Sequence, residues 1–165
     1  PVLIVGKQLA ELPARTLDFS LGRALGRVLA GTVHLATVNL RMLESTLAGV
    51  AAQFDKSFGL HLGGDEDLQE LGRNFLKLLG RKAKKSVEEP ARAYAAANPV
   101  GMHGWAEWAA RGAARCGLLV SADLHSAIQT LRREGASDEE IAGICIFNIS
   151  PRYAEARQRL ELGQG

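Results

Sequence analysis

The sequence has few aromatic residues and only two cysteines. Phe, Trp and Tyr together make up 5% of it, which excludes a core built mainly on large rings. The abundant Ala, Leu and Gly instead favour helices that pack closely through small side chains. Cys116 and Cys145 cannot form a disulfide framework, and their spacing matches no metal-binding pair. Because both lie among apolar residues, we expect them to be buried free thiols.

The chain also lacks a strong excess of one charge and any long apolar run. Its formal net charge of +2 is too balanced to indicate nucleic acid binding. No apolar run approaches the roughly 20 residues that cross a bilayer, and no secretory signal is visible. We therefore expect neither a membrane nor a nucleic acid as partner, and we expect a cytoplasmic location.

The residues that are present suit a packed domain. Hydrophobic residues make up 47% of the chain and charged residues 23%, which permits a core and argues against disorder. A length of 165 residues fits one compact domain, so we predict a single domain over residues 1–165. Since the sequence begins at Pro1 without an initiator methionine, we expect it to be part of a longer protein.

Hydrophobic periodicity predicts a mainly α-helical, multi-helix fold with one short strand. The β-prone run PVLIV ends at Gly6 and predicts an N-terminal strand over residues 1–5. Apolar residues three and four apart predict a long helix over residues 13–31. The apolar stripe of this helix is Leu17, Leu21, Leu25 and Val28. Further helices are predicted over residues 35–54, 65–79, 86–98, 102–120 and 121–135 and from residues 137 and 150 onwards, with a loop over residues 55–64.

Capping signals predict where two of these helices begin. Ser86 with Glu89, and Ser137 with Glu140, have the three-residue spacing of a capping box. The basic segment RKAKK at residues 81–85 is then expected to be a solvated turn between helices. Contact with phosphates is the alternative, but the segment has no interleaved aromatic residues to favour it.

Two segments, in the right order, resemble the active-site regions of one family of zinc peptidases. The segment PVLIVGKQLAELPARTLDFSLGRALGRVLAGTVHL resembles the strand and the helix that carry His-Glu-x-x-His and a later Gly-His in stress proteases and CAAX prenyl proteases. WAEWAARGAARCGLLVSADLHSAIQTL resembles the helix that carries their third zinc ligand. The tail SPRYAEARQRLEL is similar to versions of this domain in large bacterial tetratricopeptide-repeat proteins. The resemblance implies a bacterial protein with a metallopeptidase-like helical core.

The departures from the family's motif remove every catalytic element. The two zinc-binding histidine positions fall on Gly22 and Gly26, the general-base position on Arg23, and the third-ligand position on Ala110. Catalytic zinc needs three protein ligands and an activated water. Glycine and alanine side chains offer no donor, and a guanidinium cannot accept a proton at neutral pH. The resemblance therefore implies a pseudoenzyme with no catalytic residues, no metal and no cofactor.

The two glycines suggest what replaces the zinc site. Gly22 and Gly26 lie four apart on one face of the predicted helix. Ala106, Ala110 and Ala114 form a strip of small residues on the helix that would face it. Small residues on both sides let helix backbones approach closely. Our hypothesis is that the former cleft has become a dry contact between the two helices.

Two functions remain open from the sequence. The first is a non-catalytic protein-interaction or scaffold domain, for which Met102, Trp105 and Trp108 are the candidate interface; the same three residues could equally be core anchors. The second is a sensing domain that binds an anionic small molecule near the arginines of the degenerate motif. Its candidate ligand-binding residues are Arg23, Arg27, His34 and Arg115.

Simpler interpretations stand beside the second function. Arg23 and Arg27 could form an ordinary surface face with Asp18 or Glu11 as partners, which is the reading we favour. The four histidines match no spacing of metal ligands, so solvated or core histidines are expected. His34 is singled out because it lies one turn beyond the degenerate motif. A metalloenzyme with displaced ligands is the least favoured function.

Overall fold

The structure, a computed structural model, describes residues 5–61, 66–97 and 102–162. Within these ranges it consists of helices and their connections, without a strand, so the mainly α-helical fold is confirmed. The predicted strand lies outside the described residues except for Val5, which is in neither a helix nor a strand. In the described part of the chain, no helix combines the length and the apolar character that crossing a membrane requires.

The helices fall into two compact units, and the first unit is assembled from two separate stretches of chain. It comprises residues 1–36 and 107–165, and the second unit comprises residues 37–106 between them. No internal boundary was predicted from the sequence. The single domain over residues 1–165 stays a prediction, and each unit is described by itself.

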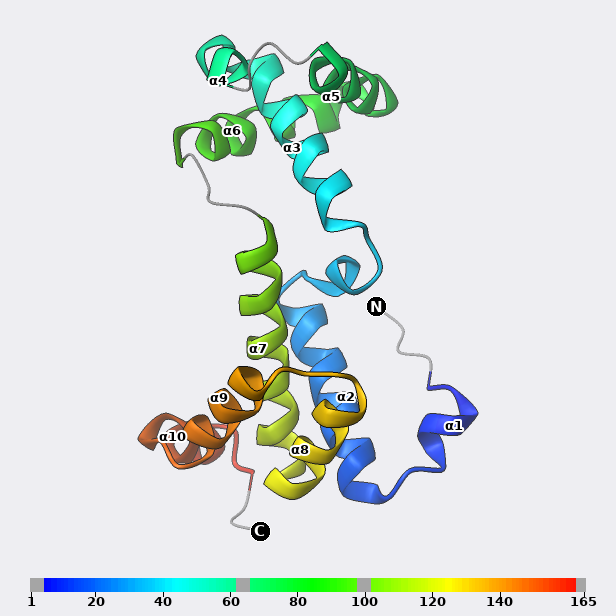
Figure 1. Cartoon of the computed structure of the whole chain (residues 1–165), viewed down its shortest axis with the longest axis vertical. Helices are drawn as coiled ribbons and strands as arrows, with labels where there is room; N and C mark the ends of the chain where they lie inside the picture. The colour runs from blue at the N-terminus through cyan, green and yellow to red at the C-terminus, as the bar shows by residue number, and fades with distance from the viewer. Residues whose placement is uncertain (1–4, 62–65, 98–101, 163–165) are drawn as a thin grey trace. The chain divides into compact units, whose positions relative to one another are not determined.

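The first unit, whose helices can be followed in Figure 1, has a core drawn from four of them. The core side chains are Phe19, Ala114, Leu118, Ala127, Leu131, Ile141 and Ile144. The helices of this unit are α1 (Lys7–Ala10), α2 (Ala14–Leu29), the 3-10 turn η1 (Val33–Ala36), residues 107–121 of α7 (Met102–Ser121), α8 (Leu124–Arg133), α9 (Asp138–Asn148) and α10 (Pro151–Arg159). The capping box predicted at the start of α9 is confirmed, because Ser137 and Glu140 each accept the other's backbone N–H.

The buried face of α2 is not the leucine stripe that periodicity predicted. Its buried residues are Thr16, Phe19, Gly22 and Gly26, whereas Leu25 is about half exposed at 48%. The prediction was wrong because it weighed side-chain hydrophobicity alone. A helix can also bury a face of glycines, since their lack of a side chain lets another backbone come close.

The C-terminal end of α7 is held by two arginines from other parts of the first unit. Arg15 Nη1 donates to the carbonyl oxygen of Ser121 at 3.0 Å, and Arg157 Nη1 donates to that of Leu119 at 2.9 Å. The last carbonyls of a helix have no donor within the helix and lie at the negative end of its dipole. Both arginines therefore stabilise the end of α7, where Ala122 then turns the chain with a φ of +53°.

The second unit packs one central helix against three others (Figure 1). Its helices are α3 (Leu40–Phe54), α4 (Lys56–His61), α5 (Glu66–Leu78) and α6 (Arg81–Ala97), and α3 contacts each of the others. The closest approach is between Gly49 of α3 and Gly72 of α5, where the backbone of each helix fills the space that a Cβ of the other would need. Small residues again set the distance between helices.

Two helices begin at residues other than those predicted, because a side chain caps the helix at each start. The helix predicted over residues 35–54 begins only at Leu40, because Asn39 caps it by accepting the N–H of Met42 at 3.2 Å. The predicted loop over residues 55–64 was wrong for its first part, which forms α4. The carboxylate of Asp55 starts α4 by accepting the first free N–H groups of its backbone.

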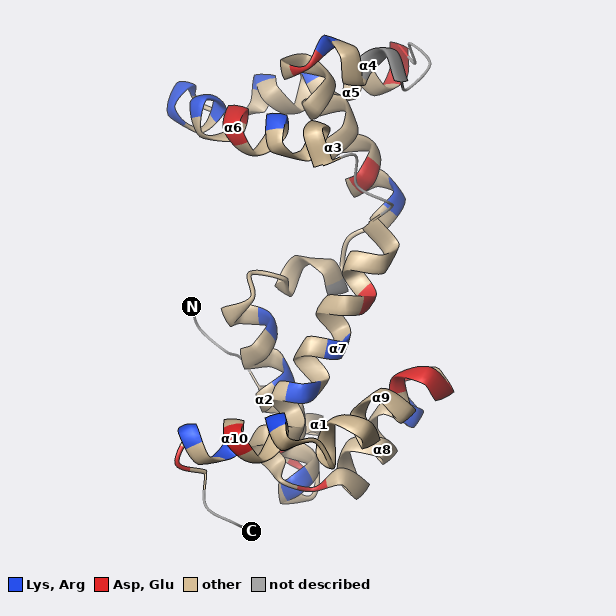
Figure 2. Cartoon of the chain, turned by 90° about the vertical axis from the view of Figure 1, so that its left-hand side faces the viewer, with Lys and Arg blue, Asp and Glu red and all other residues tan. Residues whose placement is uncertain are grey.

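The capping box predicted at Ser86 is also wrong, because α6 begins five residues earlier. Lys84 N–H donates to the Gly80 carbonyl at 3.0 Å, and the Ser86 hydroxyl donates to the Lys82 carbonyl at 3.2 Å from inside the helix. The RKAKK segment is therefore the first part of α6 and not a turn. Its cations are exposed and gather at this end of the helix, as Figure 2 shows.

Candidate functional site

The two positions that the resemblance assigns to zinc-binding histidines, Gly22 and Gly26, lie in a close contact between α2 and α7. A Cβ placed on Gly22 would lie 2.9 Å from the Cys116 carbonyl oxygen and 2.9 Å from the Gly117 Cα. One placed on Gly26 would lie 2.8 Å from the Cys116 Cβ, and one on Gly117 would lie 2.7 Å from the Phe19 carbonyl oxygen. Close packing of this kind leaves no space for larger side chains. Gly22 and Gly26 therefore serve as contact points between the two helices.

The strip of α7 expected to face these glycines is not the one that meets them. The contact is made by Ala113, Cys116 and Gly117 together with Val120, and not by the strip that contains Ala110. Because a helix turns about 100° per residue, residues three positions apart lie about 60° apart around its axis. The close contact is thus present, but Ala110 lies beside it and not within it.

Ala110 instead lines a cavity of about 230 Å³ in the first unit. The cavity is bounded by α2, α7, α8, α9 and the turn between α8 and α9. Its apolar lining is Ala110, Ala114, Leu131, Ala136 and Ile144, with Gly135 and Gly143. Its charged lining is Arg23, Arg111, Arg115, Glu134 and Glu140. The cavity thus combines an apolar surface with three cations and two carboxylates.

Arg23 is held in this lining by a residue far away in the sequence. Its Nη1 donates to Glu134 Oε2 at 2.6 Å, and its guanidinium lies 5.5 Å from the centroid of the Phe19 ring. The Arg23 side chain is only 13% exposed, and its Nε is buried without an acceptor. The predicted partners were wrong: Glu134 pairs with Arg23, while Glu11 pairs with Lys7.

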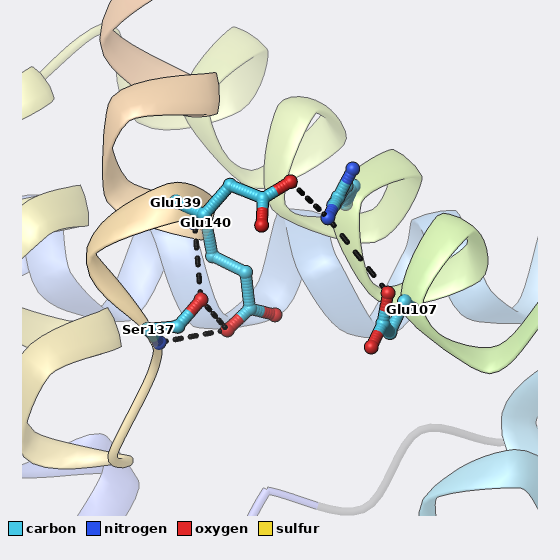
Figure 3. Close-up of polar contacts among 5 residues, drawn as sticks. Glu107, Ser137, Glu139 and Glu140 are labelled. Atoms are coloured by element: carbon cyan, nitrogen blue, oxygen red, sulfur yellow. Dashed lines mark hydrogen bonds and ion pairs between the residues drawn. The ribbon is translucent and has the colours of Figure 1, made fainter. Parts of the chain in front are cut away.

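Arg111, another arginine of the lining, lies close to two carboxylates, those of Glu107 and Glu139, which Figure 3 labels. Its Nη2 lies 2.9 Å from Glu139 Oε1 and 3.8 Å from Glu107 Oε2, while its Nε is buried without an acceptor. Glu140 is turned away from this pair and toward Ser137, whose N–H donates to it at 2.9 Å. The turn that begins α9 therefore supplies Glu139 to Arg111 and Glu140 to the helix cap.

Arg115 is the cation of the cavity that makes no ion pair within the described residues. Its guanidinium lies 5.3 Å from the centroid of the Phe147 ring, which orients it without neutralising its charge. The side chain is exposed. Arg115 can therefore offer both its charge and its hydrogen-bond donors to a ligand.

Two other predicted ligand-binding residues lie outside the cavity lining. Arg27 is half-buried, and burial together with the charge of Arg23 lowers its pKa, while Glu134 opposes that shift. His34 lies in η1 and is exposed. The structure thus brings Arg23 and Arg115 together at one site, without Arg27 or His34.

The candidate interface residues differ widely in exposure. Met102 is buried, whereas Trp105 is 40% exposed and Trp108 is 69% exposed. Trp108 belongs to the first unit, and the other two belong to the second. A tryptophan that is more than two-thirds exposed is not a core anchor, so the core interpretation is wrong for Trp108.

The remaining candidates for chemistry are the cysteines and possible metal ligands. Cys116 and Cys145 are free, as predicted, but half-buried and not fully buried. Burial raises the pKa of the Cys116 thiol, which keeps it protonated at neutral pH. Over the part of the chain that the structure covers, no three His, Cys, Asp or Glu side chains lie together so that they could hold a metal ion.

Arg111 and the carboxylates around it were not among the site residues predicted from the sequence. Glu107, Arg111 and Arg115 follow one another at intervals of four on α7, a spacing that places them on one helix face. That pattern could have identified Arg111 as a member of the site. Glu134 and Glu139 carry no comparable signal, because only the fold brings α8 and α9 against α2 and α7.

No family model matches the chain, and no curated protein or solved structure matches it. The resemblance to zinc peptidases therefore rests on the quoted segments and stays a prediction.

Proposed function

We propose that this chain is a non-catalytic domain that acts by binding a protein partner, as a scaffold or interaction module derived from a zinc peptidase. The contact between α2 and α7 carries the proposal. Gly22 and Gly26 occupy the positions where the family's motif has histidines, and both lie against the backbone or Cβ atoms of α7. The two glycines offer no donor to zinc, and the packing against α7 leaves no space at these positions for a side chain that does.

The neighbouring positions support the same proposal. Arg23, at the position of the general base, is engaged with Glu134 at 2.6 Å and cannot accept a proton. Ala110, at the third-ligand position, contributes only a methyl group to the cavity lining. The proposal also includes attachment to tetratricopeptide repeats, which the resemblance implies. A cytoplasmic location is a further part of it.

Trp108 supports a role in protein binding. Large exposed aromatic side chains are enriched at the centres of protein interfaces and contribute strongly to affinity. At 69% exposure, its indole ring has most of its surface available to a partner.

The catalytic part of the proposal is tested by metal analysis and by assay. The purified, unchelated protein is examined for metal content, and its thermal melt is recorded with and without a chelator. Hydrolysis of an unfolded protein substrate is measured alongside. We expect no stoichiometric metal, an unchanged melt and no hydrolysis. Stoichiometric zinc that is lost on chelation, or chelator-sensitive hydrolysis, would contradict the proposal.

The binding part is tested by affinity capture with matched baits. The unaltered chain, Trp108→Ala and Ile146→Ala are used in parallel, because Ile146 is also exposed and apolar and lies in the same unit. We expect one set of proteins to be retained by the unaltered chain and by Ile146→Ala and to be lost with Trp108→Ala. Identical sets from all three baits would contradict a role for Trp108 in binding.

A second function, binding of an anionic small molecule, is favoured by the cavity. Arg23 and Arg115, two of the predicted ligand-binding residues, line it together with Arg111. The test is the melting temperature of the protein in a panel of organic and inorganic anions at constant ionic strength. A ligand that binds the folded state raises this temperature in a concentration-dependent manner. If no anion in the panel raises it, the second function is wrong.

A further inference from the structure

We infer that the cavity of the first unit takes a small monocarboxylate with a short apolar body. This inference rests on the second proposed function, anion binding, and names its ligand class. The carboxylate would be bound by Arg115 with help from Arg111, and the apolar body would lie against Ala110, Ala114 and Ile144. Charge, size and hydrogen-bonding capacity of the cavity each contribute to this assignment.

The charges of the lining favour a monoanion. Three arginines and two glutamates line the cavity. Arg23 is paired with Glu134, and Arg111 is paired with Glu139, which lies just outside the lining. Arg115 is left as the cation without an ion pair among the described residues. With three arginines against two glutamates, Glu140 included, the lining carries one positive charge in excess. Glu134 and Glu140 would therefore oppose a phosphate group, with its charge of about −1.5 to −2 at neutral pH, more strongly than a carboxylate with its single charge.

The volume and the apolar lining favour a small ligand with a hydrocarbon part. About 230 Å³ is below the roughly 300–1,000 Å³ that is typical of pockets for drug-sized ligands. The lining offers methyl and branched aliphatic groups from Ala110, Ala114, Leu131 and Ile144. Burying a methylene group against such a surface contributes favourably to binding, which a fully polar anion cannot use.

The donors of the site favour a planar group with two oxygens. Arg115 is the exposed arginine of the lining, and its guanidinium, which lies against the Phe147 ring, has N–H groups available to a ligand. A carboxylate accepts from guanidinium groups in a bidentate manner, with one oxygen on each N–H. Arg111 and Arg115, one helical turn apart on α7, can present their N–H groups to the same carboxylate.

Hexanoate is the probe that tests this inference, with acetate and inorganic phosphate compared at equal ionic strength. Binding is measured as chemical-shift changes in the NMR spectrum of the full chain. The variants are Arg115→Gln, which removes the cation, and Ala110→Leu, which fills part of the cavity. Arg152→Gln is the matched control, because Arg152 is an exposed arginine of the same unit outside the lining. Thermal melts establish that each variant is folded.

We expect hexanoate to bind and acetate to bind at least tenfold more weakly. Arg115→Gln should weaken hexanoate binding about tenfold or more, Ala110→Leu should abolish it, and Arg152→Gln should change it less than twofold. Phosphate binding without hexanoate binding would overturn this inference and leave the anion-binding function standing. Binding of neither would overturn both. Equal binding of acetate and hexanoate, or hexanoate binding that survives both cavity variants, would overturn the assignment of this site.

Discussion

Gly22 on α2 and Gly117 on α7 lie so close together that a Cβ on Gly22 would be 2.9 Å from the Gly117 Cα. Each helix contributes a glycine to the contact, so backbone atoms of one helix pack against backbone atoms of the other. In a chain with only 5% aromatic residues, this close approach brings many atoms into van der Waals contact without large side chains. It also makes the contact sensitive to a single added methyl group.

Gly22→Ala is therefore expected to destabilise the protein. The new Cβ would meet the Cys116 carbonyl oxygen, the Gly117 Cα and the Val120 Cβ, each at 2.9 Å, and backbone atoms can yield only if the helices move apart. Overpacking of this kind costs about 1–3 kcal/mol. The free energy of unfolding, measured by urea denaturation, should fall by that amount.

Gly112→Ala is the control for this substitution. Gly112 is a helical glycine on α7, and a Cβ placed on it would meet nothing within 4 Å. Alanine is favoured over glycine in a helix interior by about 0.5–1 kcal/mol, so this variant should be more stable than the unaltered protein. Equal effects of the two substitutions would contradict the close contact at Gly22.

Local signals in the sequence predicted the helices better than their packing. The capping box at Ser137 was predicted correctly, because both partners lie within one turn and need no other part of the chain. The box at Ser86 failed, since helix formation from Arg81 onward uses the same backbone groups. Periodicity found α2 but not its buried face, because glycines carry no hydrophobic signal. The four-residue spacing of Gly22 and Gly26 did predict their close contact with α7.

The site depended on contacts that the sequence does not encode locally. Arg23 and Glu134 are separated by 111 positions, and no spacing rule connects them. The partners predicted for Arg23 were close in sequence, at Asp18 and Glu11, and were wrong. Of the site residues that were not predicted, only Arg111 has a signal in the sequence, which is its four-residue spacing to Arg115 on one helix.

Ala122→Gly is expected to stabilise the protein. Ala122 has a φ of +53°, a left-handed conformation that costs a residue with a Cβ roughly 1–2 kcal/mol and costs glycine almost nothing. The gain is partly offset because glycine is more flexible when unfolded. We expect the free energy of unfolding to rise by about 0.5–1 kcal/mol in urea denaturation.

The same change at Ala142 provides the opposite case. Ala142 is exposed in the interior of α9, where glycine is less favourable than alanine by about 1 kcal/mol. Ala142→Gly should lower the free energy of unfolding while Ala122→Gly raises it. A loss of stability in both variants would show that Ala122 is not strained.

The ion pair between Arg23 and Glu134 is expected to contribute measurably to stability. Its donor–acceptor distance is 2.6 Å, and the side chains are 13% and 50% exposed. Solvent on the Glu134 side weakens the pair, so a double-mutant cycle with Arg23→Gln and Glu134→Gln should give a coupling energy of about 1 kcal/mol. Lys7 and Glu11 form an exposed pair at 3.8 Å, and the corresponding cycle there should give a coupling near zero. Equal coupling energies in the two cycles would show that the pair between Arg23 and Glu134 stabilises the fold no more than an exposed ion pair does.

The N-cap of α8 should make stability depend on pH through Asp123. Its carboxylate accepts the Ser126 hydroxyl and the N–H groups of Ser126 and His125, and the Ser126 hydroxyl bond is the largest cause that lowers the pKa of Asp123. A carboxyl with a lowered folded-state pKa stabilises the fold above its unfolded pKa of about 3.9. That contribution is lost as the pH falls through the lower, folded-state pKa.

Asp123→Ala should therefore cost more stability at neutral pH than in acid. At pH 7 the variant loses a charged cap, for which about 1 kcal/mol is typical. At pH 3, below the unfolded pKa of about 3.9, the loss should be smaller because part of the carboxylate's contribution is already gone. Urea denaturation at both pH values measures the difference. Ser150→Ala is the control, since Ser150 caps α10 with a hydroxyl that does not titrate, and its cost should be the same at both pH values. If Asp123→Ala also has one cost at both pH values, the carboxylate form of Asp123 contributes no more to the cap than its protonated form.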